Sequence, residues 1–188
     1  MLLQGYLKPQ TTLFVDIDHF DNRSDISVAG AITLRSRILT NIGKIHTKDK
    51  LEIGDFETLR NSGGIHSAKT ATLQGQDLFN LGENSYLKAA ERVIIKTRYL
   101  QNEGHIQGNS FTEITAKILL NNHFISTLLG VLNINVEEFT NNASITSNGG
   151  ILSLILTRGI QKGLLFSKGD MRIEVAELLT ILRGENGK

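Results

Sequence analysis

LRNSGGI, residues 59–65, is one copy of a frame that recurs along the chain and decides its fold. The frame reads apolar-x-Asn-x-small-x-apolar, and its asparagines follow one another at spacings of 19, 20, 19, 22, 19 and 20 residues. The seven copies are FDNRSDI (20–26), LTNIGKI (39–45), LRNSGGI (59–65), LFNLGEN (78–84), LQNEGHI (100–106), LLNNHFI (119–125) and FTNNASI (139–145). Their asparagines are Asn22, Asn41, Asn61, Asn80, Asn102, Asn121 and Asn141. A repeat of about 20 residues predicts a solenoid in which each copy forms one coil.

Other positions of the frame repeat as well. The residue two before the asparagine is apolar in all seven copies, and the residue four after it is isoleucine in six. Asn84 is the exception, in the coil with the 22-residue spacing. The residue two after the asparagine is glycine in four copies, namely Gly43, Gly63, Gly82 and Gly104. We interpret these as turn glycines, because glycine accepts tight and left-handed turns without steric cost.

Pairs of apolar residues one position apart follow the frames, and such alternation is typical of half-buried strands. The pairs are Ile32 and Leu34, Leu51 and Ile53, Ala71 and Leu73, Val93 and Ile95, Leu132 and Ile134, and Leu152 and Leu154. No part of the repeat region has the sustained 3.6-residue periodicity that helical repeats require. The sequence therefore predicts an all-β parallel β-helix of about eight coils, seven led by asparagine and a weaker eighth at residues 160–166.

Stacking explains why asparagine recurs. Coils stacked about 4.8 Å apart give each strand backbone partners on both sides and bring equivalent side chains into columns. Asparagine amides in such a column can bond to one another along the stack, whereas aspartates would place like charges side by side. We therefore predict a structural ladder made of the seven asparagines, with the four turn glycines beside it.

The ends of the chain fit the frame less well. Residues 1–12 are expected to form a lead-in or cap, residues 13–170 the repeats, and residues 171–188 a last strand, cap and tail. Within the last segment, residues 173–183 also fit a short amphipathic helix that ends at Gly184. We favour the strand.

The frame L-x-N-x-G-x-I-x-[ST], followed by L-x-I at a period of about 20 residues, resembles the haemagglutinin repeats of filamentous haemagglutinin-like exoproteins. These include two-partner secretion adhesins and the stalks of contact-dependent growth inhibition proteins. The resemblance covers roughly residues 13–160. It implies a right-handed parallel β-helix, export to the bacterial cell surface, and a role as an extended adhesive or toxin-presenting stalk. The implied partners are a host or neighbouring-cell receptor or glycan, and an outer-membrane two-partner transporter.

The chain departs from the full-length pattern of that family. It shows no N-terminal secretion domain, no convincing signal peptide and no recognisable toxin domain. We therefore expect a segment of a longer exported protein, and we assign no toxic activity to these residues.

The composition narrows the classes of function. The 20 basic and 19 acidic residues nearly cancel, so no charge excess favours a nucleic-acid partner or an anionic membrane. The absence of cysteine excludes a disulfide framework, a thiolate metal site and a cysteine nucleophile. No run of about 18 apolar residues occurs, so we expect no membrane insertion.

The stretch NSGGIHSAKT, residues 61–70, is one residue short of a phosphate-binding P-loop. Ala68 stands where the second glycine would lie, and a strand pattern follows where a P-loop needs a helix. We interpret the stretch as a corner of the repeat and expect no nucleotide or other cofactor.

Two histidines occupy the same position of adjacent coils. His46 and His66 each follow a ladder asparagine by five residues, so we expect their rings to point outward and stack. One of them should then titrate below an ordinary histidine. The rest of this column offers no strong ligand, and we expect no metal site: its members include Ser27, Gln107, Ser126 and Thr146.

Carboxylates gather around the first coil. They are Asp16, Asp18, Asp21 and Asp25, with Arg23 nearby. An alternative function follows from them, a carbohydrate-active β-helix enzyme of the polysaccharide lyase or hydrolase class that uses Asp16, Asp18 and Asp21. We prefer to interpret them as solvated turn residues and predict a non-catalytic scaffold without catalytic residues. A third hypothesis is a unit that assembles end to end through open coil ends.

Overall fold

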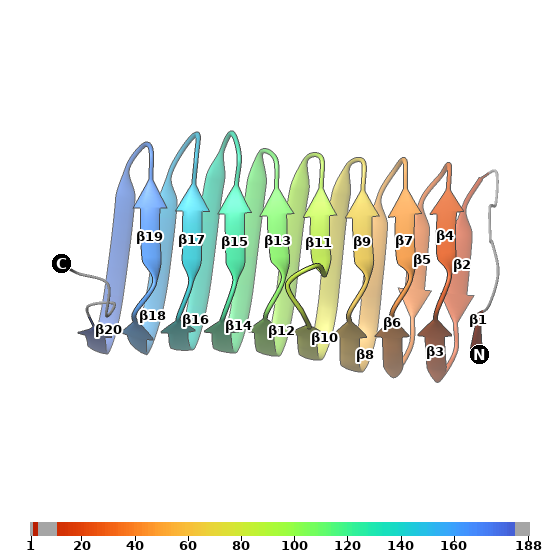
Figure 1. The fold of residues 1–188 in the computed structure, drawn as a ribbon, viewed down its shortest axis with the longest axis horizontal. Helices are drawn as coiled ribbons and strands as arrows, with labels where there is room; N and C mark the ends of the chain where they lie inside the picture. The colour runs from red at the N-terminus through yellow and green to blue at the C-terminus, as the bar shows by residue number, and fades with distance from the viewer. Residues whose placement is uncertain (1, 4–10, 183–188) are drawn as a thin grey trace.

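The computed structural model describes residues 2–3 and 11–182, and this part of the chain contains strands but no helix. Figure 1 shows the strands following one another along a single axis. The early strands are short: β1 (Leu2–Leu3), β2 (Leu13–Asp16), β3 (His19–Asn22), β4 (Asp25–Val28), β5 (Ile32–Arg35), β6 (Ile38–Asn41) and β7 (Lys44–Thr47). Long and short strands then alternate: β8 (Leu51–Asn61), β9 (Gly64–Ser67), β10 (Thr70–Asn80), β11 (Tyr86–Ala89), β12 (Arg92–Asn102), β13 (His105–Gly108), β14 (Phe111–Asn121), β15 (Phe124–Thr127), β16 (Val131–Asn141), β17 (Ser144–Ser147), β18 (Leu152–Gln161), β19 (Leu164–Ser167) and β20 (Met171–Ile181).

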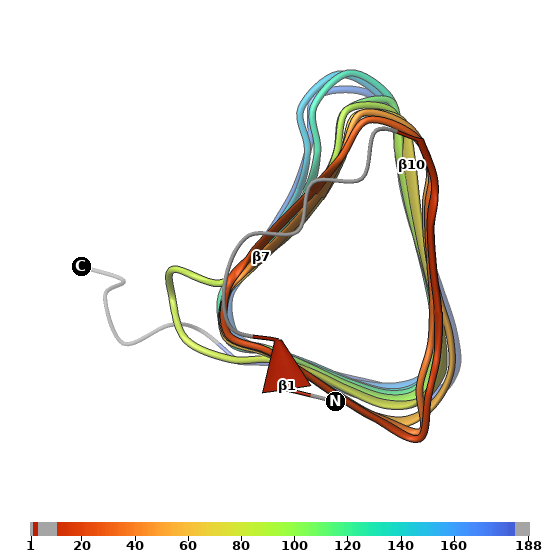
Figure 2. The same cartoon turned by 90° about the vertical axis from the view of Figure 1, so that its right-hand side faces the viewer.

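The strands wind into a right-handed parallel β-solenoid of about eight turns, which confirms the predicted fold class. Seen along the axis in Figure 2, the turns superpose on a roughly triangular outline. The first side contains β2 and β5, the second contains β3 and β6, and the third contains the short strands from β4 to β19. Each long strand bends at a corner and serves two sides, as β8 does by pairing with β5 and then with β6.

The register between turns follows the repeat frame. Asn61 pairs with Asn80, Asn80 with Asn102, and Asn102 with Asn121. Equivalent residues therefore lie above one another along the whole stack, as the repeat spacing predicts.

The core is a set of apolar columns inside the triangle. The isoleucines four residues after the asparagines are all buried and face it from the third side. The six apolar pairs that follow the frames are also buried, and they fill the first side of the core. Burial of these apolar side chains between stacked turns stabilises the fold, and a single turn on its own could not bury them.

Two phenylalanines enter the core where a glycine of the next turn makes room. Phe56 is buried at the corner of β8, and a Cβ on Gly75 of β10 would collide with its ring and carbonyl. Phe139 faces Gly159 in the same way on the second side, further along the stack. Such large–small pairs keep the packing density of the core constant from turn to turn.

The 22-residue spacing is explained by a loop. Residues 81–85 leave the triangular outline at the asparagine corner, as Figure 2 shows, and the chain returns at Tyr86. Leu87, instead of residue 84, then takes the place of the inward isoleucine and pairs with Ile65 and Ile106.

The C-terminal segment continues the solenoid. Met171–Ile181 is the strand β20, which pairs in parallel with β18 with one register shift, so the helical alternative for residues 173–183 is wrong over the part that the structure describes. The expected tail beyond residue 182 lies outside the described residues. At the other end, Leu2 and Leu3 pair with Asp21 and Asn22 of β3, and the remainder of the expected lead-in up to residue 10 is likewise not described.

Candidate functional site

The asparagines of the frame form one continuous ladder at the corner between the second and third sides. Each Nδ2 donates a hydrogen bond to the Oδ1 of the asparagine in the next turn, over 2.7 to 2.9 Å from Asn22 to Asn141. The last member is Gln161, whose Oε1 accepts from Asn141 at 3.2 Å. All eight side chains are buried, seven of them with no exposed surface.

The ladder also holds the backbone of the corner. Asn61 Nδ2 donates to the carbonyl of Tyr86 at 3.2 Å, and Asn102 Nδ2 donates to that of Phe124 at the same distance. An amide can accept along the stack and donate twice, a combination that a carboxylate lacks. Buried polar groups are costly when unpaired, and this network satisfies the polar atoms of the corner.

Small residues accompany the ladder because the turns approach closely there. A Cβ on Gly43 or Gly63 would collide with a backbone carbonyl of the preceding turn, and one on Gly104 would collide with Ser85. Gly82 does not belong to this column, which corrects its assignment as an equivalent turn glycine. It lies in the protruding loop with a φ of 84°, and Ser85 takes its place in the stack, where its carbonyl accepts from His105 N.

The near P-loop is one corner of the stack. Ser62 and Gly63 form the turn between β8 and β9, and Thr70 begins the strand β10 in place of a helix. Lys69 Nζ lies 2.8 Å from Asp49 Oδ1, so its charge is already paired. This pairing raises the pKa of Lys69. The stretch therefore offers no helix N-terminus and no free lysine to a phosphate.

The histidine column has the predicted register and one member that the sequence analysis missed. His46 pairs with His66, and the next residue in the column is Lys88. The rings of His46 and His66 are stacked, with centroids 4.8 Å apart and planes 6° apart. A second pair, His105 and His123, packs edge to face at the asparagine corner with centroids 4.8 Å apart.

Among residues 2–3 and 11–182, no group of three or more His, Asp or Glu side chains is placed to hold a metal ion.

The same part of the chain contains no helix long and apolar enough to cross a bilayer.

The acidic residues of the first turn lie on different parts of that turn. Asp16 ends β2, Asp18 lies at the corner before β3, and Asp21 lies within β3. Asp21 Oδ2 accepts from Arg23 Nε at 3.0 Å. Asp16 therefore lies on the first side of the solenoid and Asp21 on the second, with Asp18 at the corner between them.

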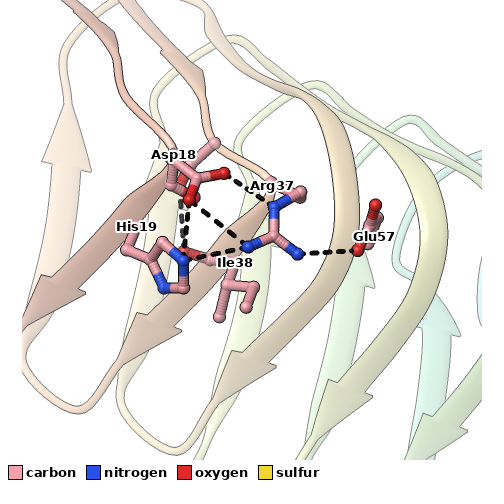
Figure 3. Close-up of polar contacts among 6 residues, drawn as sticks. Asp18, His19, Arg37, Ile38 and Glu57 are labelled. Carbon is pink, nitrogen blue, oxygen red and sulfur yellow. Dashed lines mark hydrogen bonds and ion pairs between the residues drawn. The ribbon is translucent and has the colours of Figure 1, made fainter.

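Asp18 belongs to an ion-pair cluster with the next two turns (Figure 3). Arg37 Nε donates to its Oδ1 at 2.6 Å, and His19 Nε2 lies 2.8 Å from its Oδ2. Arg37 Nη1 donates to Glu57 Oε2 at 3.1 Å. The hydrogen bond from Arg37 is the main cause that lowers the pKa of Asp18.

Ion pairs recur further along the same edge of the solenoid. Arg98 donates to both oxygens of Asp77 at 2.8 Å, and Arg158 pairs with Glu138 three turns later. Opposite charges thus pair between neighbouring turns at this edge, much as amides do at the asparagine corner. The charge spacing of about one repeat is the sequence signal that could have found these pairs.

A shallow apolar groove lies on the outer face of the second side. It has a volume of about 450 Å³ and is bordered by the Glu138–Arg158 pair. Its apolar lining includes Tyr99, Ile118, Leu120, Ile160 and Leu178.

No protein-family model, no curated protein and no solved structure matches this chain. The functional assignment therefore depends on the repeat frame and on the geometry of its residues.

Proposed function

We propose that the chain is a segment of a secreted or surface-exposed bacterial adhesin or toxin-delivery stalk of the filamentous haemagglutinin-like kind. Its role is non-catalytic: it extends from the surface and presents binding positions. The observation that carries the proposal is the unbroken column from Asn22 to Gln161, which joins every turn to the next. In such a stack each turn contacts only its neighbours, which suits an extended rod.

The surface chemistry supports display better than catalysis. Charged side chains that could act on a substrate form ion pairs between turns. Arg37, for example, pairs with Asp18 and Glu57. The side chains in the outward-facing columns differ in chemical type from turn to turn, so a partner can contact the rod at many positions along its length. We propose a receptor or glycan on a host or neighbouring cell as that partner, and an outer-membrane transporter as the partner of the parent protein.

Adhesion and catalysis can be measured side by side. The folded chain is immobilised, retention of cells and binding to a glycan array are recorded, and the same glycans are assayed in solution for new reducing or unsaturated ends. We expect binding without cleavage. Cleavage that disappears in Asp18→Asn would overturn the proposal in favour of the carbohydrate-active enzyme. Neither binding nor cleavage with a folded chain would remove the adhesive role.

A further inference from the structure

Basic side chains gather on the outer face of the third side. The first and third residues of each short strand from β4 to β19 face outward, and parallel pairing brings them into two columns along the stack. Over four consecutive turns these columns contain a group that we call the cationic patch: Lys44, His46, His66, Lys88 and His105. Among the outward residues of these strands, Asp25 of β4 is the only acid. The patch is therefore a stripe of basic groups that crosses three spacings of about 4.8 Å.

The two lysines of the patch have no carboxylate partner. In the described part of the chain, neither Lys44 nor Lys88 forms an ion pair. Burial is the largest cause that lowers the pKa of His66 and of His105, and the charge of Lys88 lowers both further. The basic groups therefore repel one another, and an anion bound across them would relieve that repulsion.

An aromatic ring lies within the patch, over a position that has no side chain. A Cβ added to Gly64 would be 2.2 Å from Cζ of Tyr86 and 2.3 Å from its hydroxyl oxygen, so this ring lies across the glycine. Gly64 is the neighbour of Lys44 in the same column. Lys88 Nζ lies 5.4 Å from the centroid of the Tyr86 ring, which is partly exposed. The patch thus combines cations with a rigid aromatic surface against which the C–H groups of a sugar can pack.

The stacked histidines can add one positive charge to the patch. The Nδ1 atoms of His46 and His66 lie 2.9 Å apart, so one of them donates to the other. In the neutral pair, one Nε2 carries a proton and the other does not, because each neutral imidazole has a single N–H. One further proton goes to the free Nε2, which leaves the Nδ1 contact intact and gives one positive charge and two Nε2–H donors. Neither Nε2 has a hydrogen-bond partner within the described residues, so both are available to an anion.

The surroundings of this histidine pair lack a free carboxylate. Titratable and charged groups on the neighbouring strands and the following corner are Asp25, Lys44, Lys48, Asp49, Lys50, Lys69, Tyr86 and Lys88. Asp49 pairs with Lys69 at 2.8 Å, and Asp25 lies beside Lys44 in the first turn. Neither carboxylate forms an ion pair with the imidazoles. A carboxylate supplied by a ligand would therefore raise the pKa of the histidine pair.

We propose that the cationic patch binds an acidic polysaccharide that carries one carboxylate on each sugar and lies along the axis of the solenoid. The carboxylates accept hydrogen bonds from the lysine ammonium groups and from the Nε2–H donors, and one sugar packs against Tyr86. A sugar residue is about as long as the spacing between turns, so successive carboxylates meet successive turns. The inference rests on the proposed adhesive function and names the class of glycan that it takes.

The modest charge of the patch favours one anionic group per sugar. Lys44 and Lys88 are permanent cations, and the histidine pair adds at most one more charge when the pH is mildly acidic. A densely sulfated chain would bring more anions than the patch can pair. Because a bound carboxylate favours the protonated pair, affinity should rise as the pH falls from 8 to 6, where the sugar carboxyls stay ionised.

Isothermal titration calorimetry with polygalacturonate tests the lysines, with dextran as the neutral probe. We expect the chain to bind polygalacturonate and not dextran. The double variant Lys44→Gln with Lys88→Gln should weaken binding by about fivefold or more, since two solvent-accessible ion pairs are lost. Lys96→Gln with Lys117→Gln removes the same charge from exposed positions outside the third side and should change the affinity by about twofold or less.

The protons that binding takes up test the histidine pair. Heats measured at pH 6.5 in buffers of different ionisation enthalpy give the number of protons taken up. We expect uptake by the wild-type chain and little uptake by the double variant His46→Gln with His66→Gln. Uptake that is the same in this variant overturns the role of the pair.

The other outcomes are separable. Absence of polygalacturonate binding, equal binding of dextran, or an equal loss of affinity in the two lysine double variants overturns the proposal, with circular dichroism as the check that each variant is folded. Dextran sulfate is compared at equal charge, and tighter binding that depends on Lys44 and Lys88 overturns the assignment to carboxylates. A chain that retains cells but does not bind polygalacturonate overturns this site and leaves the adhesive function standing.

Discussion

The Nδ1 atoms of His46 and His66 lie 2.9 Å apart on neighbouring strands of the third side. Their rings are nearly parallel, and both side chains are half-buried. At this distance one Nδ1 carries a proton and the other accepts it, so the contact suits a pair with at most one positive charge. When both histidines are protonated, both Nδ1 atoms carry a proton, so the hydrogen bond between them is lost and two donors face each other.

Titration of His66 should reflect this contact. Burial of the ring, then the charge of His46 and then that of Lys88 hold the pKa of His66 below its ordinary value of 6.5. Because the folded pKa is the lower one, the fold is fully stabilised above the ordinary value and loses that stability as the pH falls below it. Urea unfolding midpoints between pH 8 and pH 5 should show the decrease, and NMR titration of the ring should locate the pKa.

Two variants separate the causes. His46→Gln should raise the pKa of His66 only in part, because burial is the largest cause and remains. His123→Gln removes the neighbour of His105 instead and should leave His66 unchanged. A His66 that titrates at or above its ordinary value would contradict the stacked register.

The asparagine ladder should be sensitive to the loss of one amide. Asn61→Leu removes the acceptor of Asn41 and the donor to Asn80 in a fully buried corner. We expect the free energy of unfolding to fall by about 1–3 kcal/mol, since buried partners are left unpaired. Chemical denaturation monitored by circular dichroism measures the difference.

Asn142→Leu is the matched control for this experiment. Asn142 also bonds to an asparagine of the neighbouring turn, Asn122, at 2.7 Å, but both side chains are exposed to water. Its replacement should change the free energy of unfolding by about 0.5 kcal/mol or less. Equal costs for Asn61→Leu and Asn142→Leu would show that the buried ladder does not hold the turns together.

The repeat frame was sufficient to predict the solenoid, because each position of the frame has the same structural role in every turn. Asn22 to Asn141 and the inward isoleucines could be assigned from spacing alone. Gly82 could not, since an insertion after Asn80 displaces the frame by three residues and only the burial of Leu87 reveals where it resumes. The same displacement hid Lys88, which lies next to His66.

The ion pairs between turns were harder to predict for a different reason. Asp18, Arg37 and Glu57 lie at a corner, where the alternation of inward and outward residues is interrupted, so only their spacing of about one repeat relates them.

Packing of the core should be sensitive to one added methyl group. Gly75→Ala places a Cβ against the ring and carbonyl of Phe56, which is buried and has no space to move. We expect a loss of about 1–3 kcal/mol in the free energy of unfolding. On Gly64 the heavy atoms nearest to an added Cβ are side-chain atoms of Tyr86, a partly exposed ring that can turn toward solvent, so Gly64→Ala should cost less. A larger loss for Gly64→Ala would contradict the packing at Phe56.

The pKa of Asp18 should depend on its contact with Arg37 of the neighbouring turn. Arg37→Gln removes the hydrogen bonds and the charge that hold this pKa below its ordinary value of 3.8. NMR titration of the Asp18 carboxyl carbon should therefore shift to higher pH in the variant. Since the folded pKa is the lower one, the ion pair stabilises the fold above the ordinary value and is lost as the pH falls through the folded pKa. Salt should weaken the effect because the groups are exposed. Arg98→Gln breaks the corresponding pair with Asp77 and should leave Asp18 unchanged. If Arg37→Gln also leaves it unchanged, the contact between these two turns does not form in solution.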